Sequence, residues 1–184
     1  MERVYQSILS HLDFDGKGQI LDVGCGSGAL SIRAALVWPQ ARVLGIDTWP
    51  PAYNYSQCMC EKNAESEGVA VLCRFQRGDA NKLDFPDGRF DAVVSNYVYH
   101  NITGADRQAL LLETLRVLKK GGVFALNDEM KPRLYGDMEA FAQKLRDMGY
   151  EDVRLIDTAT EAFGSCRRAA MMMLGASRML VGRK

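Results

Sequence analysis

The feature that most constrains this sequence is a glycine-rich turn directly after a short apolar run. The run is Ile20-Leu21-Asp22-Val23, and the turn is Gly24-Cys25-Gly26-Ser27-Gly28. The run predicts a buried strand, and residues 30–38 predict a helix that Pro39 ends. A glycine turn between a strand and a helix lets the backbone approach a ligand closely, and the helix N-terminus favours a negatively charged ligand group. The segment therefore indicates a ligand-binding α/β protein.

The rest of the chain repeats the alternation of strand and helix. Further strands are expected over residues 42–46, 71–75, 90–94, 123–126, 153–156 and 178–181. Helices are expected within residues 1–18, from Pro51 to Gly68, from the Thr103–Asp106 pair to Lys119-Lys120-Gly121, and from Asp137 to Gly149. Such alternation predicts a doubly wound, Rossmann-like, mainly parallel sheet with helices on both faces.

Composition limits the class of protein further. The 184 residues suit a single domain, residues 1–184, and carry 23 basic and 23 acidic side chains, so no nucleic-acid partner is indicated. No apolar run is long enough to span a membrane. The cysteines are irregularly spaced and odd in number, which predicts reduced thiols in a cytoplasmic protein without a metal site; they are Cys25, Cys58, Cys60, Cys73 and Cys166.

Polar residues follow several of the expected strands. The glycine turn, Asp47, Asp79 and Asn96 each come directly after a strand, and ligands of such sheets bind at the carboxyl ends of the strands. Two cofactor classes fit at this point. Gly24, Gly26 and Ala29 also match the dinucleotide fingerprint, with Asp47 about 20 residues on, so an NAD-dependent oxidoreductase is one alternative.

Two carboxylates favour the other class. Asp22 precedes the turn, where it would repel a pyrophosphate but could receive a cationic amino group. Asp79, in Gly78-Asp79-Ala80, could accept a hydrogen bond from an adenine amino group, while Ala80 leaves room for the ring. S-adenosylmethionine carries an ammonium group where NAD carries phosphates, so this pattern favours S-adenosylmethionine.

At this point the sequence resembles the class I methyltransferase family, which binds S-adenosylmethionine. The resemblance extends from Gln19 to Arg183, and Ser95-Asn96-Tyr97-Val98-Tyr99-His100-Asn101 is similar to the ubiquinone and menaquinone methyltransferase branch. The matching blocks are residues 21–28, 45–47, 78–80, 90–96 and 118–122. The family implies a seven-stranded sheet of order 3-2-1-4-5-7-6 whose last strand is antiparallel.

The resemblance also implies roles along the cofactor. Gly24, Gly26 and Gly28 would wrap its methionine and ribose parts, with Asp22 near the amino group. Asp47 would accept hydrogen bonds from both ribose hydroxyls.

The adenine end and the far end of the pocket receive the remaining implied roles. Thr48 and Trp49 would pack near the adenine edge. In the Gly78-Asp79-Ala80 segment, Asp79 would bind the adenine amino group. Ser95 and Asn96 would close the pocket beside the methionine moiety.

His100 is the candidate catalytic residue, as a general base toward a small-molecule methyl acceptor. The alternative is that it hydrogen-bonds the helix start near Asn101 and Thr103. Only about 18 residues precede the first strand. We therefore expect an acceptor cleft that is open, or that is completed by a second subunit, as in a homodimer, or by an N-terminal segment missing from this sequence. A non-catalytic S-adenosylmethionine-binding module remains a further alternative.

Overall fold

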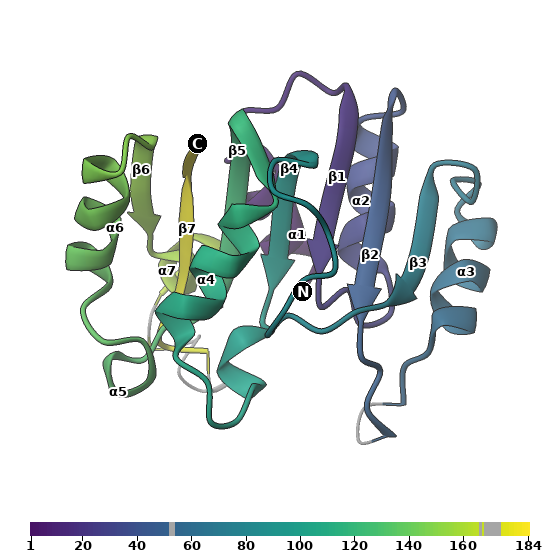
Figure 1. The fold of residues 1–184 in the computed structure, drawn as a ribbon. Helices are drawn as coiled ribbons and strands as arrows, with labels where there is room; N and C mark the ends of the chain where they lie inside the picture. Colours follow the sequence, from purple (N-terminus) through teal and green to yellow (C-terminus); the bar gives the residue numbers. More distant parts are fainter. Residues whose placement is uncertain (52–53, 166, 168–173) are drawn as a thin grey trace.

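The computed structural model describes residues 1–51, 54–165, 167 and 174–184, so Cys166 lies outside the described residues (Figure 1). Its described strands form one sheet of order β3-β2-β1-β4-β5-β7-β6. The first five strands pair in parallel, and β7 pairs antiparallel with both β5 and β6. The predicted strand order and antiparallel last strand are confirmed. The strands are β1 (Gly18–Val23), β2 (Ala41–Asp47), β3 (Cys73–Arg77), β4 (Phe90–Asn96), β5 (Leu118–Glu129), β6 (Glu151–Ile156) and β7 (Ser177–Arg183).

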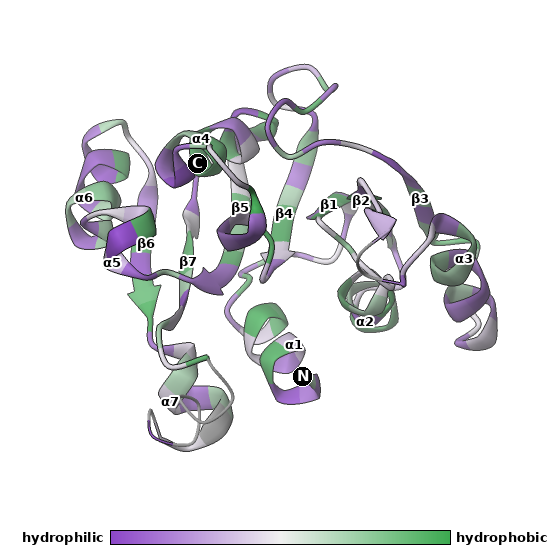
Figure 2. Cartoon of the chain, turned by 90° about the horizontal axis from the view of Figure 1, so that it is seen from below, coloured by the Kyte–Doolittle hydropathy of each residue, from purple (hydrophilic) through white to green (hydrophobic). Residues whose placement is uncertain are grey.

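Helices cover both faces of the sheet, as the sequence predicted. In Figure 2, α4 and α6 lie on one side of it, and α1, α2 and α7 lie on the other. Each layer buries its own apolar cluster against the sheet, one built around Ile8, Ile20 and Ala92 and the other around Val93, Leu111 and Phe124. The helices are α1 (Glu2–Ser10), α2 (Ala29–Val37), α3 (Gln57–Ser66), α4 (Arg107–Arg116), α5 (Pro132–Tyr135), α6 (Met138–Asp147) and α7 (Thr158–Phe163), and a 3₁₀ turn spans Tyr99–Asn101.

Two predicted helix starts are wrong. The helix expected from Pro51 begins at Gln57, because the Ser56 hydroxyl accepts a hydrogen bond from the Met59 N–H and caps it there. The helix expected to start at the Thr103–Asp106 pair has Asp106 itself as its N-cap, since that carboxylate accepts from the N–H groups of Gln108 and Ala109.

The segment after α4 was also assigned wrongly. Lys119-Lys120-Gly121 was predicted to end the helix, but α4 ends at Arg116 and β5 already begins at Leu118. Leu118 pairs with Phe90, and an irregularity in register follows before Ala92 pairs with Val123. The third strand likewise begins at Cys73 rather than at Val71, which is 83% exposed.

No helix among the described residues is long and apolar enough to cross a membrane.

Candidate functional site

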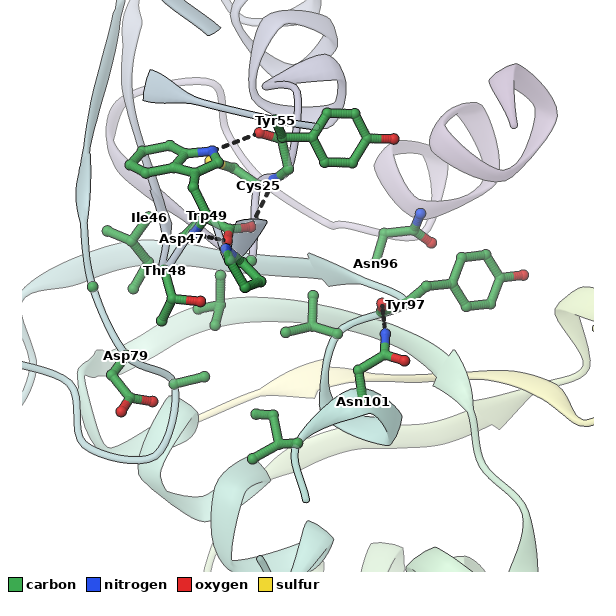
Figure 3. A pocket seen from close by; sticks show the side chains of 18 of the residues that line it. Cys25, Ile46, Asp47, Thr48, Trp49, Tyr55, Asp79, Asn96, Tyr97 and Asn101 are labelled. Atoms are coloured by element: carbon green, nitrogen blue, oxygen red, sulfur yellow. Dashed lines mark hydrogen bonds between the residues drawn. The ribbon is translucent and has the colours of Figure 1, made fainter. Parts of the chain in front are cut away.

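A cavity of about 490 Å³ lies at the carboxyl ends of β1 to β4, where sheets of this kind bind ligands (Figure 3). Its walls include most of the residues expected to bind a cofactor: Gly24, Gly26, Asp47, Thr48, Trp49, Gly78, Asp79, Ala80 and Asn96. Asp22, Gly28, Ser95 and His100 are not among the residues that line it. Asp47 and Asp79 supply carboxylates to the lining, and no described lysine, arginine or histidine side chain lines it.

Most backbone N–H groups of the glycine loop, although not that of Ser27, have partners among the described contacts. The N–H groups of Gly24 and Cys25 donate to the carbonyl of Ile46 at 2.8 and 3.0 Å, and the N–H of Gly28 donates to Cys25. Gly24 has a φ of 71°, and a Cβ built on it would lie 2.3 Å from Val98 Cγ2. Only glycine fits there, because both the left-handed backbone and the close approach of Val98 exclude a side chain.

Asp47 holds this loop to the end of β2. Its Oδ2 accepts a hydrogen bond from the Gly26 N–H at 2.9 Å, and its Oδ1 accepts from the Trp49 N–H at 2.7 Å. The Trp49 indole Nε1 donates to the Gly26 carbonyl at 2.8 Å, which closes a ring of contacts between the two segments (Figure 3). Each carboxylate oxygen retains a further lone pair that a ligand hydroxyl could use.

Asp79 lies at the other side of the cavity, on the loop after β3 (Figure 3). Its Oδ1 accepts from both the backbone N–H and the side-chain amide of Asn81, at 2.8 and 2.7 Å. Its Oδ2 has no hydrogen bond among the described contacts, and Asp79 is one of the residues that line the cavity. Ala80 is 8% exposed beside it.

Three predicted residues lie beneath the cavity lining. Asp22 is buried, and its carboxylate accepts from the Ser31 hydroxyl at 2.6 Å; burial raises its pKa to about 7. Ser95 is buried and donates to the Val23 carbonyl at 2.9 Å. Gly28, with a φ of 80°, is the N-cap residue of α2.

His100 is oriented by a buried carboxylate that the sequence did not connect to it. The ring Nδ1 of His100 hydrogen-bonds to Asp128 Oδ1, and Asp128 is completely buried. Asp128 also accepts from the backbone N–H groups of Tyr99 and His100, at 2.7 and 3.2 Å, and of Glu129 at 2.6 Å. Since Nδ1 meets an acceptor, it carries the hydrogen in the neutral ring, and Nε2 keeps its lone pair. The helix start at Thr103 is not its partner.

The cavity lining includes residues that sequence reasoning missed. Met1, the N-cap of α1, and Tyr5 of α1 line it, together with Tyr55, Val98 and Ile102. An amphipathic helix at the start of the chain carries no signal of which strand ends it will cover, so this contact appears only in three dimensions. Within the described residues, no group of three or more metal-ligating side chains occurs.

Comparison with known proteins agrees with this geometry. Residues 21–126 match the model of a family described as a methyltransferase domain. A demethylmenaquinone methyltransferase of Symbiobacterium thermophilum is 33% identical over 135 residues, which cover 71% of this chain and 50% of that protein. The chain thus spans about half the length of this curated relative.

Two solved structures share the fold over nearly the whole chain. A geranyl diphosphate methyltransferase in complex with GPP and sinefungin has a TM-score of 0.75 and 13% identity, covering 99% of this chain and 78% of its own. The [4+2]-cyclase SpnF has a TM-score of 0.74 and 20% identity, covering 100% of this chain and 81% of its own. The second likeness means that the fold alone does not specify methyl transfer.

Proposed function

Because the chain belongs to the class I S-adenosylmethionine-dependent methyltransferases, in the branch of the demethylmenaquinone methyltransferases, we propose that it methylates a small-molecule acceptor bound beside Asn96 and Tyr97. When bound, S-adenosylmethionine would supply a methyl group on a cationic sulfonium, whose carbon–sulfur bond breaks as a nucleophile bonds to the methyl carbon in line and S-adenosylhomocysteine leaves. The protein's contribution is to hold both reactants in register, an effect worth about 7–11 kcal/mol in well-oriented reactions.

The charge of the cavity carries this proposal. Two aspartates line it, without a basic side chain among its described residues, so a cationic ligand is favoured over a pyrophosphate. The glycine loop adds to this preference. The N–H groups of Gly24, Cys25, Gly26 and Gly28 are all bonded within the protein, so they are not free to bind phosphate oxygens as a dinucleotide loop would.

The roles of individual residues follow the order of the strands. Asp79 would bind the adenine amino group through its free oxygen, with Ala80, Thr48 and Trp49 beside the ring. Asp47 would accept the ribose hydroxyls.

The methionine part would then lie at the glycine loop, with Asn96 beyond it. Asp22, hydrogen-bonded to Ser31 beneath the loop, would not contact the cofactor directly. Burial raises its pKa to about 7, and the ammonium group of the cofactor would favour its ionised form. The methyl acceptor would bind next to the methionine part of the cofactor, beside Tyr97.

His100 is proposed as the general base for an acceptor that must lose a proton. His100 does not line the cavity, so its Nε2 would take that proton from a part of the acceptor that extends beyond the lining. Asp128 would fix the tautomer and stabilise the resulting imidazolium. Acceptors that attack as a neutral amine or as an anion need no such step, so the His100–Asp128 pair matters most for hydroxyl or carbon acids.

The test is calorimetric titration with S-adenosylmethionine, S-adenosylhomocysteine and NAD, followed by transfer of labelled methyl to an acceptor panel. The panel includes a demethylnaphthoquinol, a sterol and a fatty acid, because relatives named for these substrate classes match the chain. We expect the first two compounds to bind and NAD not to bind. Binding of NAD alone would overturn the proposal, and saturable binding without transfer to any acceptor would favour a binding module.

A further inference from the structure

A chain of buried polar side chains runs from β7 to the cavity. Tyr97 Oη and Ser177 Oγ are 2.7 Å apart, Ser177 Oγ and Thr158 Oγ1 are 2.8 Å apart, and Thr158 Oγ1 lies 2.7 Å from Asn127 Oδ1. Asn127 Nδ2 then donates to Asn96 Oδ1 at 2.8 Å. Ser177, Thr158 and Asn127 are all 0% exposed, so water cannot replace any of these bonds.

The direction of every hydrogen in this chain follows from the orientation of the Asn127 amide, whose Oδ1 faces Thr158 in this structure. An amide oxygen can only accept, so the single hydrogen of the Thr158 hydroxyl is donated to Asn127 Oδ1. Ser177 must therefore donate to Thr158, and Tyr97 must donate to Ser177. At the other end, Asn127 offers its Nδ2 to Asn96, which fixes the Asn96 oxygen toward the protein interior.

The consequence is a fixed amide at the cavity wall. Asn96 lines the cavity, and its Oδ1 is held by Asn127, so its Nδ2 remains the donor available to a ligand (Figure 3). The neighbouring Asn101 amide is already directed to the Tyr97 carbonyl at 3.4 Å.

Other donors for an anionic group are scarce in this part of the cavity. The glycine loop uses the N–H groups of Gly24, Cys25, Gly26 and Gly28 internally. Within the described lining, no basic side chain supplies a charge. A carboxylate bound between this loop and β4 would therefore be met by neutral donors. The Asn96 Nδ2 and the Ser27 N–H both belong to residues that line the cavity, and neither has a partner among the described contacts.

We propose that Asn96 Nδ2 binds the carboxylate of the amino-acid end of the cofactor, and that Asn127, Thr158 and Ser177 are positioning residues that fix this orientation of the amide. The inference rests on the proposed function, since that carboxylate belongs to S-adenosylmethionine. Asn127 does not line the cavity and acts only by deciding which end of the Asn96 amide faces the ligand.

The decisive variant is Asn127→Asp. Its carboxylate still accepts from Thr158 but can no longer donate, so Asn96 must turn its amide over and present Oδ1 to the ligand. We compare binding of S-adenosylhomocysteine with that of 5′-methylthioadenosine, which lacks the amino-acid end. We expect the first affinity to fall at least tenfold and the second to stay within about twofold. Equal losses for both compounds, or no loss for either in a folded variant, would overturn the proposal.

A second readout needs no ligand. Hydrogen exchange of the Asn96 side-chain NH₂, followed by NMR, should be fast in the wild type and at least tenfold slower in Asn127→Asp, where that group becomes a buried donor. Slow exchange in the wild type would overturn the assigned direction even if the protein binds the cofactor. This readout therefore separates failure of the inference from failure of the proposed function.

Two more variants guard against a trivial result. Thr114→Val removes another buried threonine hydroxyl, which pairs with Tyr99 Oη at 3.0 Å away from the chain, and should leave the ratio of the two affinities unchanged. Asn96→Ala removes the proposed donor without adding charge. If Asn127→Asp does not fold, Asn96→Ala should still weaken the binding of S-adenosylhomocysteine about tenfold and leave the binding of 5′-methylthioadenosine unchanged. Wild-type protein that binds neither compound would overturn both the proposed function and this role.

Discussion

The Asp47 carboxylate accepts a hydrogen bond from the Gly26 N–H at 2.9 Å, which ties the end of β2 to the glycine loop after β1. The residue proposed to bind the ribose therefore also sets the shape of the loop that surrounds the rest of the cofactor. Its Oδ1 does the same for the Trp49 backbone. Loss of this side chain should affect binding both directly and through the loop.

Asp47→Ala should weaken S-adenosylhomocysteine binding by about 1–3 kcal/mol or more, the range for hydrogen bonds to a charged group. Asp47→Asn keeps one acceptor oxygen and should lose less. Calorimetric titration measures both variants, with circular dichroism as the check on folding. An unchanged affinity in folded Asp47→Ala would remove Asp47 from the ribose site.

Asp22 should make stability depend on pH. Burial raises its folded-state pKa from 3.8 to about 7, so between these values the folded protein keeps a proton that the unfolded chain has lost. Stability should therefore fall as pH rises from about 4 to about 7, by up to about 1.4 kcal/mol per unit, and level off above. The Asp22→Asn variant should lose this dependence on pH. Urea unfolding at pH 4.5 and at pH 7.5 would measure the free energy of unfolding of both proteins.

The control for this pH series is Asp84→Asn, because Asp84 is exposed. It should keep the wild-type slope. If Asp22→Asn shows the same slope as the wild type, then the Asp22 carboxyl is not the group responsible.

His100→Ala should lower the rate of methyl transfer to a hydroxyl or carbon acid by about 10²–10⁴, the usual contribution of a general base, with cofactor affinity nearly unchanged. Asp128→Asn should reduce the rate as well, because the imidazole loses the carboxylate that fixes its tautomer. Steady-state kinetics and cofactor titration test both variants. A large loss of cofactor affinity in His100→Ala would mean that this side chain binds the cofactor, and would contradict its role as a general base for the acceptor.

Lys184 should stabilise the end of α4. Its Nζ donates to the carbonyls of Leu115, Arg116 and Leu118 at 2.8, 3.1 and 2.9 Å, and burial lowers its pKa. Lys184→Met should cost about 1–3 kcal/mol in the free energy of unfolding, because these carbonyls lose a charged donor. Lys120→Met changes an exposed lysine and should stay within about 0.5 kcal/mol. Equal stabilities of the two variants would contradict the capping role.

The parts of the fold that the sequence predicted correctly depend on patterns local in the chain. Short apolar runs and the glycine turn mark β1 and α2, and the alternation along the chain gives the layers. The boundary after α4 was wrong because Lys119-Lys120-Gly121 fits a helix end and a strand start equally well. The pairing of Leu118 with Phe90 decides between them, and that contact joins residues 28 positions apart.

The residues of the candidate site likewise fall into those that the sequence could place and those that only the folded structure brings together. Residues at strand ends, such as Asp47 and Asp79, could be placed on the cavity because the carboxyl ends of parallel strands share one edge. Asp128 could not be paired with His100 from the sequence, since a solvated loop acid and a buried acceptor look alike there. The Asn127–Thr158–Ser177 connection joins three elements, and only the folded sheet brings them together.

The position of β7 between β5 and β6 bears on how the protein is made. In the described sheet β6 pairs only with β7, and β7 is synthesised after β6. Five parallel strands can therefore assemble during synthesis while β6 waits unpaired, with an exposed edge that other chains could join. Ser177 belongs to the same strand, so the cavity wall at Tyr97 can take its final form only after β7 has been synthesised.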